Sequence, residues 1–183
     1  LAGVCMSASR GESGFRRWLW GPYSRLALKV ALAILVIDQA HKWWMLLVYR
    51  IEEKGRVVVT PFFDLVFVKN TGISYSLLDQ SSYAWQMVLA LFSVLVSAAL
   101  WAWLAAAGTG RLMAWALGLI IGGALGNGLD RLLIGGVADF FSFHAFGFYW
   151  YVFNIADVAI VAGVAALLYD SLRASRNDAA KPG

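Results

Sequence analysis

Four aspartates interrupt otherwise apolar stretches of the sequence, and their carboxylates are the side chains best suited to chemistry. Asp130, Asp139 and Asp157 lie within residues 122–157, and Asp38 lies far upstream. An acid held at membrane depth costs roughly 3 kcal/mol on insertion scales, so it is a functional candidate by default. Two such carboxylates could act together as a general acid and a general base.

The composition indicates an integral membrane protein. Of 183 residues, 61% are hydrophobic and 14% are charged, whereas a soluble domain carries about a quarter charged residues. The mean hydropathy is +0.68. The net charge of +4 comes from bases at the ends of apolar stretches, where they set topology, so no nucleic-acid partner is indicated. The single cysteine, Cys5, cannot form an intrachain disulfide.

The elements that must position these acids are four apolar stretches, each near the ~20 residues that cross a bilayer. We expect an α-helical integral membrane protein with four transmembrane helices at residues 24–49, 83–107, 112–129 and 153–172. Residues 1–23 predict a flexible basic leader, and residues 173–183 a polar tail. Residues 50–80 are rich in β-branched and aromatic residues with turn glycines, which predicts short strands on one face of the membrane.

Two further segments have distinctive compositions. The third apolar stretch is rich in glycine, which permits close helix packing. Residues 132–151 are expected to form a loop rich in Phe, Trp and Tyr, the composition of a membrane-interface belt. Those aromatics could also form the wall of an apolar substrate groove.

The basic residues predict the topology. The leader, the turn at residues 107–111 and the tail carry Lys and Arg with few acids, whereas residues 50–80 carry as many acids as bases. The positive-inside rule therefore puts both termini in the cytoplasm. All four aspartates then fall towards the outer face of the membrane.

Local spacing gives the acids polar neighbours. Asn127, Asp130 and Arg131 share one helical face, and Asp130 and Arg131 could form a buried pair. Asp38 and Lys42, at i and i+4, allow an ion pair within one helix. A structural role is favoured for both pairs.

Asp139 and Asp157 are different. Asp139 has no basic neighbour within its own loop, and Asp157 lies near the amino end of the fourth helix, where the helix macrodipole favours an ionised carboxylate. If folding brought them together in a poorly solvated pocket, they would share a proton, which is the arrangement of an aspartyl protease. Asn154 precedes Asp157 by three residues. From the residues alone, a capping role and a catalytic role remain equally open. His41 and His144 lack metal-ligand spacing and are interpreted as interfacial polar residues.

Five motifs in order resemble those of lipoprotein signal peptidase, also called signal peptidase II, a bacterial membrane aspartyl protease family. The resemblance covers nearly all of residues 25–170. Tyr75 stands where Phe is more usual in the family. The motifs are DQAHKWW at 38–44, NTGISYSLL at 70–78, GGALGNGLDR at 122–131, VADF at 137–140 and FNIAD at 153–157.

The resemblance implies a catalytic pair, Asp139 and Asp157, and no metal or cofactor. It also implies four helices with a small extracytoplasmic β-cradle, so that residues 24–172 form one membrane peptidase domain. The implied partners are lipid-modified prolipoproteins, membrane lipids and globomycin-type cyclic peptide inhibitors, at the bacterial inner membrane. The implied supporting residues are Asp38, Lys42, Asn70, Gly72, Asn127, Asp130, Arg131 and Asn154.

A small proton-coupled transporter that uses intramembrane carboxylates is the alternative from another class. It predicts acids staggered through the bilayer depth and an internal repeat, whereas the acids here gather on one side and no repeat is visible. A non-enzymatic scaffold would leave the polar clustering unexplained.

Overall fold

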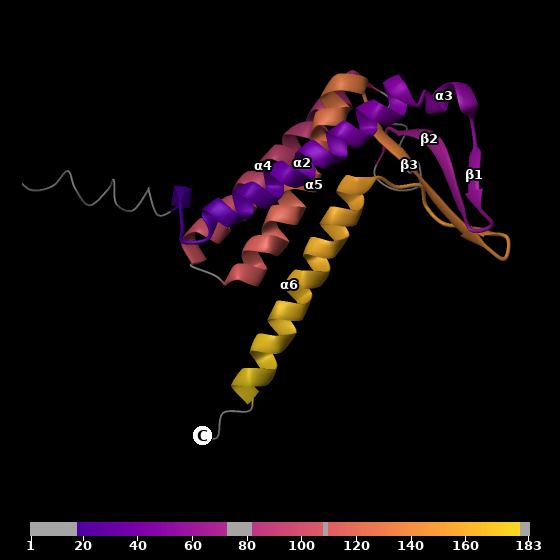
Figure 1. The fold of residues 1–183 in the computed structure, drawn as a ribbon. Helices are drawn as coiled ribbons and strands as arrows, with labels where there is room; N and C mark the ends of the chain where they lie inside the picture. Colours follow the sequence, from indigo (N-terminus) through magenta and orange to yellow (C-terminus); the bar gives the residue numbers. More distant parts are fainter. Residues whose placement is uncertain (1–17, 73–81, 108–109, 180–183) are drawn as a thin grey trace, which may run out of the picture.

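The computed structural model describes residues 18–72, 82–107 and 110–179 (Figure 1). Four long helices form a bundle: α2 (Ser24–Trp43), which ends in a π-helical turn η1 (Trp44–Val48), α4 (Tyr83–Ala107), α5 (Arg111–Ile134) and α6 (Ile155–Ala179). All four are long and apolar enough to cross a membrane, which confirms the predicted four-span fold. The leader up to residue 17, residues 73–81 with Tyr75, residues 108–109 and the last four residues lie outside the described ranges.

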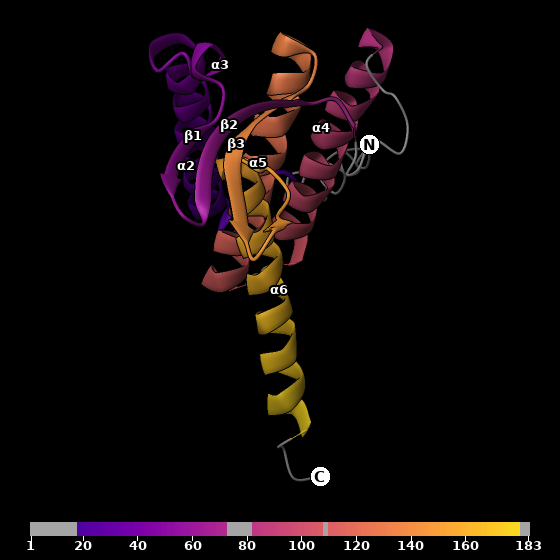
Figure 2. The same ribbon diagram turned by 90° about the vertical axis from the view of Figure 1, so that its right-hand side faces the viewer.

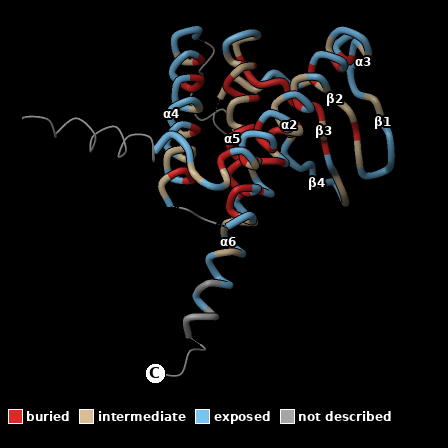
Figure 3. Tube along the Cα trace, turned by 60° about the vertical axis from the view of Figure 1, so that its left-hand side comes forward, coloured by how far each residue is buried: buried red, intermediate tan, exposed pale blue. Residues whose placement is uncertain are grey.

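Helix α5 is the centre of the bundle, because α2, α4 and α6 each pack on it. Figure 3 shows that buried positions concentrate on α5, while the outward faces of the other helices are exposed. Glycines permit the close contacts: a Cβ at Gly122 would lie 2.6 Å from the carbonyl oxygen of Ala31 in α2, and one at Gly123 would lie 2.5 Å from that of Ala156 in α6. Small residues at helix contacts are typical of membrane bundles.

The predicted end of the third span at residue 129 was too early, because α5 continues to Ile134. Asp130 and Arg131 lie inside this helix, as the helical spacing from Asn127 predicted.

A four-stranded antiparallel sheet extends from one end of the bundle, and its strands lie crosswise to the helices in the view of Figure 1. Figure 2 shows the sheet in front of the bundle, with α6 extending below it. The order of the sheet is β1 (Val57–Thr60), β2 (Phe63–Asn70), β3 (Val137–Ala145) and β4 (Phe148–Tyr149), and the short helix α3 (Ile51–Lys54) precedes it. The strands at 50–80 are as predicted. The loop predicted for 132–151 is wrong, since β3 and β4 form there.

Strand β3 has two different faces. Ala138 and Phe140 are buried against Met45 and Ile51, which form a small core beneath the sheet. Because side chains alternate along a strand, Asp139 faces the opposite way, towards the start of α6. The strand pairing therefore aims one of the predicted acids at the helix that carries another.

Candidate active site

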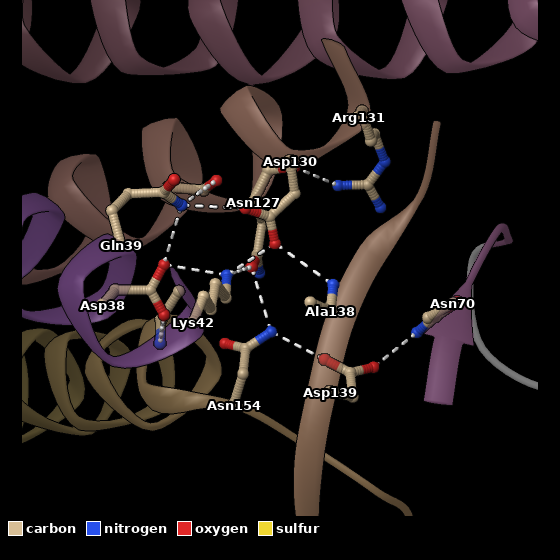
Figure 4. Close-up of polar contacts among 12 residues, drawn as sticks. Asp38, Gln39, Lys42, Asn70, Asn127, Asp130, Arg131, Ala138, Asp139 and Asn154 are labelled. Atoms are coloured by element: carbon tan, nitrogen blue, oxygen red, sulfur yellow. Dashed lines mark hydrogen bonds and ion pairs between the residues drawn. The ribbon is translucent and has the colours of Figure 1, made fainter. Parts of the chain in front are cut away.

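The predicted site residues come together where the bundle meets the sheet (Figure 4). They are contributed by five elements that are distant in sequence, and in the structure their side chains form one network of hydrogen bonds and ion pairs. Its members and the elements that carry them are Asp38 and Lys42 (α2), Asn70 (β2), Asn127, Asp130 and Arg131 (α5), Asp139 (β3), and Asn154 and Asp157 (the start of α6).

Lys42 is the buried cation of this network. Its Nζ lies 2.8 Å from Asp38 Oδ2, 2.8 Å from Asp130 Oδ2 and 3.1 Å from Asn127 Oδ1. The Lys42 side chain is 2% exposed, so its charge is compensated by protein groups rather than by water. The predicted Asp38–Lys42 ion pair is confirmed.

The predicted Asp130–Arg131 pair is wrong. Asp130 binds Lys42 and accepts further hydrogen bonds from Gln39 Nε2 (2.8 Å) and from the backbone N–H of Ala138 (3.1 Å). The Arg131 Nη1 donates to the backbone oxygen of Asn127, one turn earlier, at 3.0 Å. The physical reason is that consecutive residues of a helix do not face each other. Asp130 thus ties α5 to α2 and to β3.

Asn154 connects Asp139 and Asp157. Its Nδ2 donates to Asp139 Oδ1 at 2.6 Å, and its backbone N–H donates to Asp157 Oδ2 at 3.2 Å. The Asn154 Oδ1 in turn accepts from the backbone N–H of Asp157 at 3.0 Å, a reciprocal cap at the start of α6. The two carboxylates are therefore held by the same residue.

Asn127 links this pair to the buried lysine. Its Nδ2 donates to Asp157 Oδ1 at 2.8 Å, and its Oδ1 accepts from Lys42 Nζ and from Asn154 Nδ2, each at 3.1 Å. Accepting from Lys42 fixes which end of the amide is oxygen, so the amide nitrogen must point at Asp157. The buried Lys42 thereby orients the Asn127 amide so that it donates to Asp157.

Asn70 holds Asp139 from the other side. Its Nδ2 donates to Asp139 Oδ2 at 3.2 Å and to the hydroxyl of Tyr151, and its Oδ1 accepts from the backbone N–H of Gly72 at 3.2 Å. Gln39 and Tyr151 are the polar members of this network that the sequence did not single out. Gln39 adjoins Asp38 within a recognised motif, whereas Tyr151 is one of many aromatics in its segment and gave no signal.

Burial and nearby charges raise the pKa values of Asp139 and Tyr151, which lie outside the membrane-spanning helices. Desolvation by burial, followed by the charge of Asp157, raises the pKa of Asp139 from 3.8 to about 7, against the opposing hydrogen bonds of Asn70 and Asn154. Burial, followed by the charge of Asp139, raises the pKa of Tyr151. The carboxyl of Asp139 can therefore hold a proton near neutral pH.

A groove of about 630 Å³ opens beside Asp157, whereas Asp139 is 1% exposed and meets the groove through its partner Asn70. The polar end of the groove includes Asn70, Asn127, Arg131 and Asp157, and its apolar wall continues along α6 through Val158, Val161, Ala162 and Ala165. Gly72, Trp150, Tyr151 and Phe153 also line it. Such a shape suits an extended chain with a polar bond at one end and an apolar portion within the membrane-spanning region.

Among the described residues, no three His, Cys, Asp or Glu side chains are grouped as a metal site would require. His41 instead packs on the rings of Phe140 and Phe141. His144 lies beside Asp64, with Nε2 3.1 Å from Asp64 Oδ2, on the sheet and apart from the network.

Comparison with known proteins finds one family over most of the chain. A family model described as signal peptidase (SPase) II matches residues 30–173. The lipoprotein signal peptidase of Methylocella silvestris is 50% identical over 153 residues, 82% of this chain and 88% of the relative. That of Rhodopseudomonas palustris strain CGA009 is 49% identical over 152 residues, 81% of this chain and 92% of the relative.

Solved structures agree on the fold. One bacterial membrane enzyme aligns with a TM-score of 0.67 at 25% identity, over 80% of this chain and 92% of its own. Another aligns with a TM-score of 0.69 at 24% identity, over 86% and 94% of the two chains.

Proposed function

We propose that this chain, which belongs to the signal peptidase II family, is an aspartic endopeptidase whose catalytic pair is Asp139 and Asp157. The observation that carries the proposal is the shared partner Asn154, which donates to one oxygen of each carboxylate. Asp157 lines the polar end of the groove, and Asp139 is buried behind it. Membership of this peptidase family makes proteolysis the established activity. The chemistry assigned to the two aspartates is our inference.

In the proposed mechanism the two acids have opposite protonation states. Asp139, whose pKa is raised to about 7, holds the proton and donates a hydrogen bond to the scissile carbonyl. Asp157, half-buried at the groove, is the ionised partner and takes a proton from the attacking water. The hydroxide oxygen bonds to the carbonyl carbon, and the tetrahedral intermediate collapses as its C–N bond breaks and the leaving amine is protonated by Asp157.

The remaining polar residues act as positioning residues. Asn154, Asn127 and Asn70 hold carboxylate oxygens and leave the reacting carboxyls little rotational freedom. Holding groups in a reactive geometry before substrate binds is a large part of catalysis. The buried cluster of Lys42, Asp38 and Asp130 fixes α2, α5 and β3 relative to one another.

The proposed substrates are lipid-modified prolipoproteins. The relatives' name, lipoprotein signal peptidase, supports this substrate class, and so does the apolar wall that runs down α6 from the carboxylates. A diacylglyceryl cysteine and the signal peptide would both lie in the bilayer, which would present the scissile bond at the level of the pair. A globomycin-type cyclic peptide is proposed to compete for the same groove.

The proposed orientation puts both termini in the cytoplasm and the site on the extracytoplasmic face of the inner membrane. The distribution of Lys and Arg supports it: the bundle end away from the site carries Arg25, Lys29, Arg111 and Arg173. Reporter fusions at the C-terminus test the orientation. A fusion active only outside the cytoplasm would reverse it.

The test of function is incubation of the purified protein with a lipid-modified precursor peptide and with the same peptide unmodified. We expect cleavage of the modified peptide and loss of that cleavage when the cyclic peptide is added. Failure to cleave the modified peptide, together with proton-coupled uptake of a solute into proteoliposomes, would favour the carrier alternative.

A further inference from the structure

The far end of the sheet carries an exposed aromatic face. Phe62, in the β1–β2 turn, lies with Phe143, Phe148 and Trp150 around a shallow hollow of about 230 Å³, which His144 and Ala145 also line. Phe62 is 58% exposed, Phe148 64% and Trp150 62%. In the part of the chain that the structure describes, no element covers this face. Contiguous exposed aromatics on a small sheet usually mark an interaction surface.

The opposite face of the same strands is polar. His144 stacks on Tyr149, and its Nε2 lies 3.1 Å from the buried carboxylate of Asp64. Arg56 Nε approaches that carboxylate to 3.4 Å, and its guanidinium lies over the ring of Tyr149. The hairpin of β3 and β4 is therefore amphipathic, with polar side chains on one side and exposed aromatic rings on the other.

The turn at the tip of this hairpin has a backbone conformation that is energetically unfavourable for a Phe residue. Ala145 pairs with Phe148, so Phe146 and Gly147 form a two-residue turn, with φ of +52° and +80°. Turns of this kind favour Asn-Gly, because both positions need positive φ. A bulky residue at positive φ is an outlier, yet this position carries a fully exposed Phe. Neither the turn geometry nor packing within the described chain explains an aromatic side chain here.

The aromatic face lies on the same side of the sheet as the membrane-spanning surface of α6. Phe143 stacks on Phe153 at a centroid distance of 5.7 Å, and Phe153 lies two residues before the start of α6. Trp150 lines both the hollow at the tip and the main groove, whose wall continues down α6 through Val158 and Val161. The strands extend sideways from the bundle, crosswise to the helices (Figure 1). Trp150 and Phe153 thus connect the hairpin tip to the apolar wall along α6.

We propose that the β3–β4 hairpin tip is a membrane anchor, with Phe62, Phe146 and Phe148 inserted into the headgroup–acyl boundary of the leaflet on the active-site side. Aromatic side chains favour that layer. Lipid contact supplies the burial that the chain does not give Phe146. Because β3 also carries Asp139, the anchor fixes the far end of that strand at the membrane surface. This inference goes beyond the proposed chemistry and holds whether or not Asp139 is catalytic.

The test places a fluorophore at the tip of the full-length protein in proteoliposomes of phosphatidylethanolamine and phosphatidylglycerol. In a Cys5→Ser background, Phe146→Cys is labelled with an environment-sensitive dye, and Phe148→Cys provides a second, independent site. Glu53→Cys on α3 is the matched control, since its side chain is 67% exposed beside the polar side of the sheet. Circular dichroism and cleavage activity check that each labelled protein is folded.

We expect blue-shifted emission at 146 and 148, strong quenching by a nitroxide on the lipid acyl chain and weak quenching by aqueous iodide. The label at 53 should show the reverse. Iodide quenching at 146 and 148 as strong as at 53 would overturn the proposal. A blue shift that occurs only after a precursor peptide is added would also overturn it, because the face would then bind the substrate protein rather than lipid.

Discussion

Replacing Asp139 with Asn should stabilise the fold at high pH and destabilise it at low pH. The folded pKa of this acid is raised from 3.8 to about 7, so the folded state binds the proton more tightly than the unfolded chain. The stability that this carboxyl contributes is fully present below about pH 4 and is lost as the pH rises through about 7. Asn cannot ionise, so the variant keeps its stability across that window.

The magnitude follows from the shift. About three pKa units at 1.36 kcal/mol each give roughly 4 kcal/mol lost by the natural protein between about pH 4 and pH 8. Asn presents an NH₂ group where Asp139 accepts from Asn154 or Asn70, and losing one such hydrogen bond costs about 1 kcal/mol. The variant should therefore be less stable by about 1 kcal/mol at pH 4 and more stable by about 3 kcal/mol at pH 8.

Reversible unfolding by sodium dodecyl sulfate in mixed micelles, followed by circular dichroism at both pH values, measures this difference. Asp170→Asn, in α6 away from the network, is the control and should leave the pH dependence unchanged. Asp157→Asn should shrink the pH dependence, because the charge of Asp157 is the second cause of the Asp139 shift. Equal stability differences at pH 4 and pH 8 for Asp139→Asn would refute the reasoning.

Three further outcomes follow from the same geometry. Cleavage should decline as the pH rises through about 7, because Asp139 loses the proton that it donates; a flat kcat/KM from about pH 6 to pH 9 would contradict this role. Lys42→Met should cost about 3–5 kcal/mol of unfolding free energy, because Asp38 and Asp130 lose their buried cation. A cost below about 1 kcal/mol would show that Lys42 is not needed to compensate the two carboxylates. Gly123→Ala should cost about 1–3 kcal/mol, because its Cβ would lie 2.5 Å from the carbonyl oxygen of Ala156, whereas Gly110→Ala, whose Cβ meets nothing within 4 Å, should be close to neutral.

Much of the fold could be predicted because membrane spans give a strong local signal. A run of about 20 apolar residues leaves few alternatives, and the glycines of α5 indicated close packing that the contacts at Gly122 and Gly123 bear out. The family assignment, made from ordered motifs, is confirmed by the match over residues 30–173. The strands at 137–149 were missed because their aromatic composition was interpreted as an interfacial loop, although alternate residues face opposite sides.

The pairing within the site could be predicted only where both partners share one helix. Asp38 and Lys42 are four residues apart, so helical geometry alone joins them. The contacts of Asp130 with Lys42 and with the backbone of Ala138 depend on how α2, α5 and β3 pack, which no local spacing encodes. The same holds for the raised pKa of Asp139, whose main cause is burial by distant segments.

The most direct test of the central claim is the cleavage rate of purified Asp139→Asn and Asp157→Asn on a lipid-modified precursor peptide, beside the natural protein. An asparagine side chain fills nearly the same space as the aspartate that it replaces, so circular dichroism should confirm folded protein in both cases. We predict that cleavage is abolished in both variants, because neither a proton donor nor a base can be replaced by an amide. Cleavage at the natural rate by either folded variant would contradict the assignment of the catalytic pair.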